Sequence, residues 1–496
     1  MLPSIPRLED YDVSEVHGFL PTDPPLSALS DPYYRPWENL VQNLQPLILS
    51  KRLRGLVDDL PVLTTDHLKN DQEWRRAYVI LAFLSHAYIW GGDTPSERVP
   101  PSISIPFTAA CNHLELPLVA TYAGVCLWNW RPIFPDEGVD SLENLSTLHT
   151  FTGSLDESWF YLVSVAIEAR GAPIVPMMLD AIEAARYGQT DIVTECLRSF
   201  AERLDELGSL LQRMYENCDP HVFYHRIRPF LAGSKNMRDA GLPNGVIFDT
   251  GSSEDTYVQY SGGSNAQSSI IQFFDIALGI EHRPTGQTAT KPATSDPHST
   301  ISADQAPPQN FIHDMRTYMP GAHARFLRHV ESIANIRQFV RDHQNDRALA
   351  TAYDACLAML RAFRDKHIQM VSRYIIVKSR ESRSHSRSLS PREAPRYERV
   401  NLASRKPSQG KGGKDDKGGL RGTGGTSLIP FLKQARDETG EPAIDAWARR
   451  LLGNGPGVGN GVRLGKMGEH ASGEMEIVGL AGVWSVDDSD GGICHW

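Results

Sequence analysis

The chain has 496 residues, a length at which a single hydrophobic core stops growing, so two folded units with some unfolded sequence are expected. Hydrophobic residues make up 41% of the chain and charged residues 22%, which is ordinary for a globular protein and excludes a fully disordered chain. The formal net charge of -10 argues against a whole-protein binder of nucleic acid or anionic membrane, because both need a basic face, and leaves a small neutral or zwitterionic ligand open.

The cysteines and the apolar runs indicate a cytoplasmic protein without a membrane segment. The six cysteines are Cys111, Cys126, Cys196, Cys218, Cys356 and Cys494. They have no CxxC spacing, so neither a zinc ribbon nor a dense disulfide framework is indicated, and a reducing compartment fits. The first residues lack a basic stretch followed by an apolar one, so no secretory signal is expected. The longest apolar run, Ala77 to Trp90, is shorter than the roughly 20 residues of a membrane span and predicts a buried helix.

Residues 1–150 predict a small, mostly helical N-terminal domain. Its helical stretches are interrupted by proline-rich connections such as Pro100-Pro101, and the run Ile103 to Phe107 predicts a short strand. From Ser154 the pattern changes, because Ser154-Leu-Asp-Glu157 has the form of a capping box before the apolar run Trp159 to Ile167.

The sequence after residue 150 predicts a large bundle of helices. In the segment Thr190 to Asn217, apolar residues recur three or four positions apart, the spacing of one helical face. The members of this face are Ile192, Cys196, Phe200, Leu204, Leu207, Leu211 and Met214. Further helices are predicted at Pro220 to Leu231, Ser268 to Ile280, Phe311 to Ser332 and Ala348 to Val377. We therefore predict an all-α fold, with a large helical domain at 151–378 and 421–445 capped by the smaller N-terminal domain.

Three stretches depart from this pattern. Arg283 to Asn310 is rich in Pro, Thr, Ser and Ala and predicts a surface loop. Residues 379–420 mix Arg, Ser, Lys and Gly and predict a disordered basic linker; the Arg-Ser part suits a kinase target or a weak RNA contact as well as a plain solvated linker. The Gly-rich tail at 446–496 shows no periodicity and is given no function.

His367 is the first candidate for chemistry. It lies on the apolar face of the helix Ala348 to Val377, between Phe363 and Val371, so its imidazole is expected to point inward. A buried imidazole needs a partner, which a metal bond or a hydrogen bond supplies. The position alone leaves an iron ligand and a satisfied core histidine both open.

The second candidate is a pocket for an aromatic amino acid. Phe223 and Tyr224 precede Arg228 by about one turn, so a guanidinium can grip a carboxylate while an aromatic face covers the ring. A helix-terminal arginine in a surface ion pair is the plain alternative. The Gly/Ser string Ser261 to Ser269 suits a polar ligand loop or a simple helix cap. The string Gly422 to Thr426, before the apolar Leu428 to Leu432, suits a lid or a remnant of the linker.

These signals occur in one order along the chain, together with several longer strings. The strings are LSHAYIWG at 84–91, LELPLVATYAGVCLWNW at 114–130, FYLVSVAIE at 160–168, GGSNAQSS at 262–269, HDMRTYMPGAH at 313–323 and the helix containing YDAC and KHIQMVSRYI. Over roughly residues 10 to 440 this combination resembles the indoleamine 2,3-dioxygenase family of the fungal type.

The resemblance implies a haem-dependent enzyme that uses O2 to cleave the indole C2–C3 bond of L-tryptophan. The product would be N-formylkynurenine, on the kynurenine route to NAD. Haem b would be held by His367 as proximal iron ligand, the other axial position staying open for O2. The implied haem-side residues are His367, Ser264, Asn265, Arg364 and Asp275, the last two as an ion pair. The implied substrate-side residues are Tyr122, Phe160, Ser164, Phe223, Arg228, Ser264 and Thr423, of which Ser164, Phe223, Arg228 and Thr423 would act on the reacting substrate. No nucleic-acid or membrane partner is implied, and a monomer is expected.

A second hypothesis is a catalytically weak haem-binding regulatory protein of the same fold. It rests on departures from the family pattern. Pro229 predicts a non-helical conformation at Arg228, which would shift the guanidinium. Tyr224 stands where the family often has phenylalanine, and Asn265 where a smaller residue is common, so both are expected to narrow or polarise the pocket.

Overall fold

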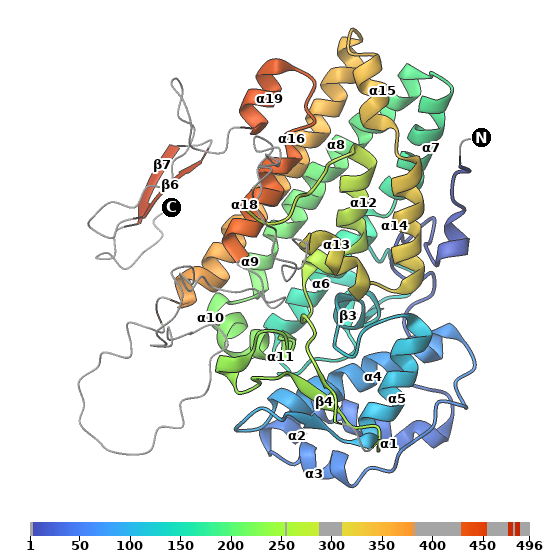
Figure 1. Ribbon diagram of the computed structural model, residues 1–496, viewed down its shortest axis with the longest axis vertical. Coiled ribbons are helices and arrows are strands. Elements are labelled where there is room, and N and C mark those ends of the chain that lie inside the picture. Colours follow the sequence, from blue (N-terminus) through green and yellow to red (C-terminus); the bar gives the residue numbers. More distant parts are fainter. Residues whose placement is uncertain are drawn as a thin grey trace, which may run out of the picture.

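The computed structural model describes residues 3–252, 255–286, 310–379, 381 and 428–453, together with two short strands at 475–479 and 482–486. The helices of the first part of the chain gather at one end of the molecule, and most of the later helices make up the rest (Figure 1). The helices of the N-terminal part are α1 (Arg35–Gln42), α2 (Leu44–Leu49), α3 (Leu53–Asp58), α4 (Asp71–Trp90) and α5 (Pro101–Leu114). The all-α prediction is therefore confirmed, while the boundary at residue 150 stays a prediction.

The larger part of the chain is a bundle in which α16 packs along α8 and α18 packs along α16. Its helices are α6 (Leu155–Gly171), α7 (Ile174–Arg186), α8 (Thr190–Gln212), α9 (Met214–Asn217), α10 (Pro220–Val222), α11 (Arg228–Leu231), α12 (Ser269–Leu278), α13 (Phe311–Met315), α14 (Gly321–Ile333), α15 (Ile336–Asp342), α16 (Arg347–Val371), α18 (Leu428–Thr439) and α19 (Ala446–Gly453). Three π-helical turns adjoin them, at Ala123–Leu127, Phe223–Ile227 and Ser372–Val377.

The strands are short and lie at the margins of the helices. β4 (Val246–Phe248) pairs in parallel with β1 (Arg98–Val99) and antiparallel with β5 (Tyr257–Val258), with Arg98 opposite Ile247. β2 (Trp130–Pro132) pairs antiparallel with β3 (Leu145–Thr147), and β6 (Met475–Gly479) with β7 (Gly482–Val486).

Burial explains why these segments are helices. In α4 every residue from Ala77 to Ile89 is buried, as expected for a helix that is apolar all round. The stretch Leu155–Arg186, which contains α6 and α7, is long and apolar enough to cross a membrane by length and composition. However, 78% of its apolar window is buried inside the protein, which is typical of a core helix. One continuous hydrophobic core joins the N-terminal helices to the bundle.

Three predictions of local structure were wrong in detail. The run Ile103 to Phe107 lies in α5 rather than in a strand, because Pro101 starts a helix there. The burial follows the helical period: Ile103 and Phe107 are one turn apart and buried, while Ile105 between them is 38% exposed. The predicted helix Phe311 to Ser332 is divided before Gly321, where Pro320 lies in an extended conformation.

The third difference concerns the first turns of α8. Ile192 is 46% exposed, and Val193 and Leu197 are buried instead, so the apolar face there is rotated by one residue. The start of the Gly-rich tail at 446–496, whose sequence shows no periodicity, is helical, and this helix, α19, packs against α16 and α18. Most of the predicted linker at 379–420 and most of the predicted loop Arg283 to Asn310 lie outside the described residues.

Candidate functional site

A single apolar cavity collects most of the predicted site residues. Its volume is about 250 Å³, and its walls come from α6, α12, α16, α18 and the loop before α12. Predicted site residues that line it are Tyr122, Phe160, Ser164, Phe223, Arg228, Ser264, Asn265, Asp275, Arg364 and His367. Thr423 lies outside the described residues, so its predicted role stays a prediction.

The three π-helical turns all contribute to the wall of this cavity. Val125 and Cys126 come from the first turn, Phe223 from the second, and Tyr374 and Ile375 from the third. A π-helical turn inserts an extra residue into a helix and is frequent at functional sites. These turns locally re-aim the side chains of otherwise regular helices.

His367 faces the cavity from the last third of α16. Burial, together with the charge of the nearby Arg364, lowers the pKa of the His367 imidazole to about 4, so the ring is neutral at physiological pH. Within the described part of the chain, no hydrogen bond engages either ring nitrogen. The plain alternative of a core histidine satisfied by protein hydrogen bonds therefore has no support here. A neutral imidazole beside an apolar space suits a metal bond.

Arg228 is buried, with an exposed fraction of 3%, rather than in a surface ion pair. Burial lowers the pKa of its guanidinium, whose central carbon lies 5.7 Å from the ring centroid of Tyr224. The prediction of a non-helical Arg228 was wrong: its φ of -51° and ψ of -37° are helical. Helical geometry is retained because Pro229 occupies an early position of α11, where no backbone donor is required.

Aromatic rings accompany the arginine. Phe160 and Phe223 are in contact, with ring centroids 4.8 Å apart, and Tyr374 packs edge-on against Phe223 at 5.6 Å. Tyr224 is fully buried and does not belong to the cavity wall, so the expectation that it narrows the pocket is not supported. Asn265 does line the cavity. A buried cation beside a cluster of rings can bind a flat aromatic acid.

The Gly/Ser loop serves both predicted purposes. Ser268 caps α12 by accepting a hydrogen bond from the Ile271 amide, and Ser264 caps the 3-10 turn Asn265–Gln267. Residues of the same loop, among them Gly263 and Ser264, line the cavity. The loop is therefore a helix cap and a cavity wall together.

Arg364 and Asp275 form the predicted ion pair. The Arg364 Nη2 atom lies 2.7 Å from both Oδ1 and Oδ2 of Asp275, and both side chains are largely buried. Burial alone would raise the pKa of Asp275, but the charges of Arg364 and His282 outweigh it and lower that pKa. Because Arg364 stands one turn before His367, this pair fixes the helix that presents the imidazole.

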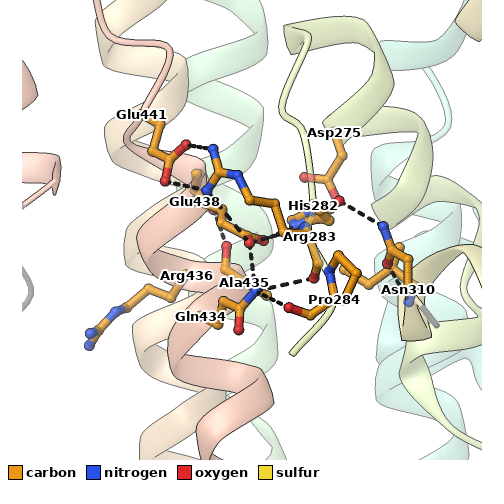
Figure 2. A network of polar contacts seen from close by, with 12 residues as sticks. Asp275, His282, Arg283, Pro284, Asn310, Gln434, Ala435, Arg436, Glu438 and Glu441 are labelled. Carbon is orange, nitrogen blue, oxygen red and sulfur yellow. Dashed lines mark hydrogen bonds and ion pairs between the residues drawn. The ribbon is translucent and has the colours of Figure 1, made fainter. Parts of the chain in front are cut away.

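The ion pair belongs to a larger network that the sequence did not reveal (Figure 2). His282 bridges two buried carboxylates, with Nε2 at 3.0 Å from Asp275 Oδ2 and Nδ1 at 2.7 Å from Glu438 Oε2. Glu438 also accepts hydrogen bonds from the Arg283 amide and the Gln434 side chain. The network connects α18 with α12, and α18 lines the cavity through Leu428, Phe431, Leu432 and Ala435.

Sequence reasoning also missed Glu168, which lies directly behind the cavity wall. It is fully buried in α6, and its Oε1 accepts hydrogen bonds from Tyr122 Oη at 3.0 Å and Ser268 Oγ at 2.7 Å. The available signal was a single charged residue at the end of the apolar stretch Phe160 to Ile167.

The fold and the cavity define an all-helical protein with an apolar ligand site that presents the imidazole of His367 and the guanidinium groups of Arg228 and Arg364. Residues 7–442 match the family model described as indoleamine 2,3-dioxygenase. An indoleamine 2,3-dioxygenase of Saccharomyces cerevisiae is 41% identical over 449 residues, which cover 88% of this chain and 93% of the relative. An indoleamine 2,3-dioxygenase of Aspergillus candidus is 39% identical over 438 residues, and a 6-hydroxytryptophan 2,3-dioxygenase of Fusarium equiseti is 38% identical over 432 residues. Each of these matches covers 87% of this chain and 96% of the relative.

The chain belongs to the indoleamine 2,3-dioxygenase family. The family implies a haem, and the residues present fit one. Among the described residues that line the cavity, His367 is the only histidine, and its ring is neutral and has no protein hydrogen bond. Most of the other lining side chains are apolar, as a flat macrocycle requires.

Proposed function

We propose that the protein is a haem-dependent dioxygenase that cleaves the indole C2–C3 bond of L-tryptophan with O2 to give N-formylkynurenine. One observation carries the proposal: a neutral imidazole without a hydrogen-bond partner among the described residues shares an apolar cavity with a buried guanidinium and a cluster of aromatic rings. The imidazole suits haem iron, and the guanidinium together with the aromatic rings suits an aromatic amino acid. Membership of the family supports the same assignment.

The residues divide into those that would hold the cofactor and those that would hold the substrate. His367 would bind the iron, and the ion pair of Arg364 with Asp275 would fix the helix that carries it. When bound, haem iron supplies the centre at which O2 is activated.

The substrate side of the pocket would orient the indole and exclude water. Arg228 would bind the substrate carboxylate through charge-assisted hydrogen bonds, while Phe160 and Phe223 cover the indole ring. Indole is electron-rich at C3, so the reaction needs no strong base from the protein. Ser164 contributes a hydroxyl to the same wall and is positioned to hold a proton or a polar substrate atom there.

A product assay tests the proposal. The purified protein is loaded with haem, supplied with ascorbate, methylene blue, O2 and L-tryptophan, and the products are identified by mass spectrometry. We expect N-formylkynurenine. Bound haem without product would instead favour the catalytically weak regulatory protein. One argument for that alternative was a displaced Arg228, which the helical, cavity-lining arginine does not support.

Further parts of the proposal concern the setting of the reaction. We propose that the protein acts in the cytoplasm as a monomer, without nucleic-acid or membrane partners, and feeds the kynurenine route to NAD. Size-exclusion chromatography with light scattering tests the oligomeric state, and cell fractionation tests the location. A dimer or a membrane-bound fraction would contradict the respective statement.

A further inference from the structure

A buried carboxyl group ties three segments of the cavity wall together. Glu168 lies one turn after the cavity-lining Ser164 on α6 and is itself behind the wall. Tyr122 and Ser268, which both line the cavity, donate hydrogen bonds to the same oxygen, Oε1 of Glu168. The carboxyl thus connects α6 with the segment before the first π-helical turn and with the N-cap residue of α12.

The second carboxyl oxygen makes this arrangement unusual. Oε2 of Glu168 is buried and has no hydrogen-bond partner among the described residues. An unpaired buried oxygen is destabilising, and an ionised one more so. A glutamine would supply the same acceptor to Tyr122 and Ser268 without a charge, so holding the two hydroxyls does not by itself require a carboxyl group.

We propose that Glu168 is a positioning residue of the pocket, which holds Tyr122 and Ser268 in place and makes substrate affinity depend on whether its own carboxyl group is protonated. The inference rests on the proposed function, since its substrate is the aromatic amino acid assigned to this pocket. Ionised Glu168 accepts charge-assisted hydrogen bonds, which are roughly twice as strong as those to the neutral acid. The wall is therefore held more firmly when Glu168 has lost its proton.

The electrostatic surroundings of Glu168 support a change in its protonation near neutral pH. Burial raises the pKa of Glu168 to about 7, against the opposing effect of the hydrogen bonds from Ser268 and Tyr122. In the part of the chain that the structure describes, the titratable groups that interact with Glu168 are the Tyr122 phenol and the Cys126 thiol. Burial raises the pKa of both, so they stay neutral while Glu168 titrates.

The test measures L-tryptophan binding to the haem-loaded protein by calorimetry, at one pH about one unit below the pKa of Glu168 and at one pH about one unit above it. For the wild type we expect a Kd about three- to ten-fold higher at the lower pH. Glu168→Gln keeps an acceptor for both hydroxyls but cannot ionise, so its Kd should be the same at both pH values. The matched control is Glu157→Gln, on the same helix, whose carboxyl bonds Phe151, Thr152 and Tyr161 outside the cavity wall. This control should keep the wild-type pH dependence.

A second measurement needs neither haem nor substrate. The infrared C=O band of protonated Glu168, taken as the difference between spectra of the same protein at low and high pH, should disappear as pH rises through neutrality and should be missing in Glu168→Gln. Tyr122→Phe removes one hydrogen bond to the carboxylate and should move this midpoint to higher pH; it also serves if Glu168→Gln does not fold.

Two results would overturn the proposal: wild-type pH dependence retained in Glu168→Gln, or a midpoint that Tyr122→Phe leaves unchanged. Absence of L-tryptophan binding in the wild type at either pH contradicts the proposed function instead. The infrared titration still decides the protonation of Glu168 in that case.

Discussion

Replacing Asp275 by Asn tests whether the buried ion pair holds the helix that carries His367. The substitution keeps the size of the side chain and removes its charge. Asp275 is buried and accepts two hydrogen bonds from Arg364 and one from His282. Two cations therefore lose their shared anion.

Arg364 and His282 respond differently to the loss of the Asp275 charge, and this difference sets the size of the loss in the free energy of unfolding. Removing one partner of a buried ion pair is destabilising by about 3–5 kcal/mol. His282 can release its proton, because burial lowers its pKa and the charge and hydrogen bond of Asp275 are the main influences that raise it, with a further contribution from Glu438. Arg364 cannot, so its guanidinium alone remains buried without the anion, although it still bonds Thr439. We expect a loss near the lower limit, about 3 kcal/mol in the free energy of unfolding.

Urea unfolding of the haem-free protein at neutral pH, followed by circular dichroism, measures this loss. The matched control is Glu281→Gln, which breaks the ion pair of Glu281 with Arg337 at 2.8 Å. The Glu281 side chain is 76% exposed, so its loss should stay below about 1 kcal/mol. If Asp275→Asn destabilised the protein no more than this surface control, the ion pair would not hold the bundle together.

Three further predictions concern the imidazoles and the arginine. His367→Ala should abolish haem binding with little loss of fold, and a full Soret band in the variant would refute the ligand assignment. Arg228→Ala should raise the KM for L-tryptophan by roughly 10-fold or more, because charge-assisted hydrogen bonds contribute about 1.5–3 kcal/mol; an unchanged KM would place the carboxylate elsewhere. His86 accepts from the Ala120 amide and donates to the Phe230 carbonyl as a neutral ring, and burial lowers its pKa to about 4. The contribution of neutral His86 to the free energy of unfolding is fully present above pH 6.5 and is lost as the pH falls toward 4, a change of roughly 3 kcal/mol. His86→Gln should therefore flatten the dependence of the free energy of unfolding on pH in this range. A stability curve unchanged in that variant would contradict the assignment.

The helices were predictable because their signals are local. The face of α16 follows from residues three and four positions apart, and the structure places Tyr353, Leu357 and Leu360 in the core and His367 at the cavity. Proline-rich segments were less predictable. Ile103 to Phe107 has the composition of a strand, yet Pro101 starts a helix there and no partner strand is available in the described structure.

The candidate site was predictable only where a chemical residue type stood on a periodic face or in a family string. His367 and Arg228 met this condition, and both line the cavity. Glu168 was visible as a charge at the end of an apolar helix, but its two partners lie 46 and 100 residues away along the chain. Nothing in its own segment indicates which hydroxyl groups it would meet.

The helical class and the inward direction of His367 could be read from the sequence, because each depends on residues within a few turns of one another. The order of the family strings could be read as well, because it is a property of the chain itself. That His282 bridges Asp275 and Glu438 became visible only in the folded protein, since His282 and Glu438 are 156 residues apart. Hydrogen bonds between distant groups depend on how whole helices pack, and hydrophobic periodicity records which face is buried without specifying the partner that the face will meet.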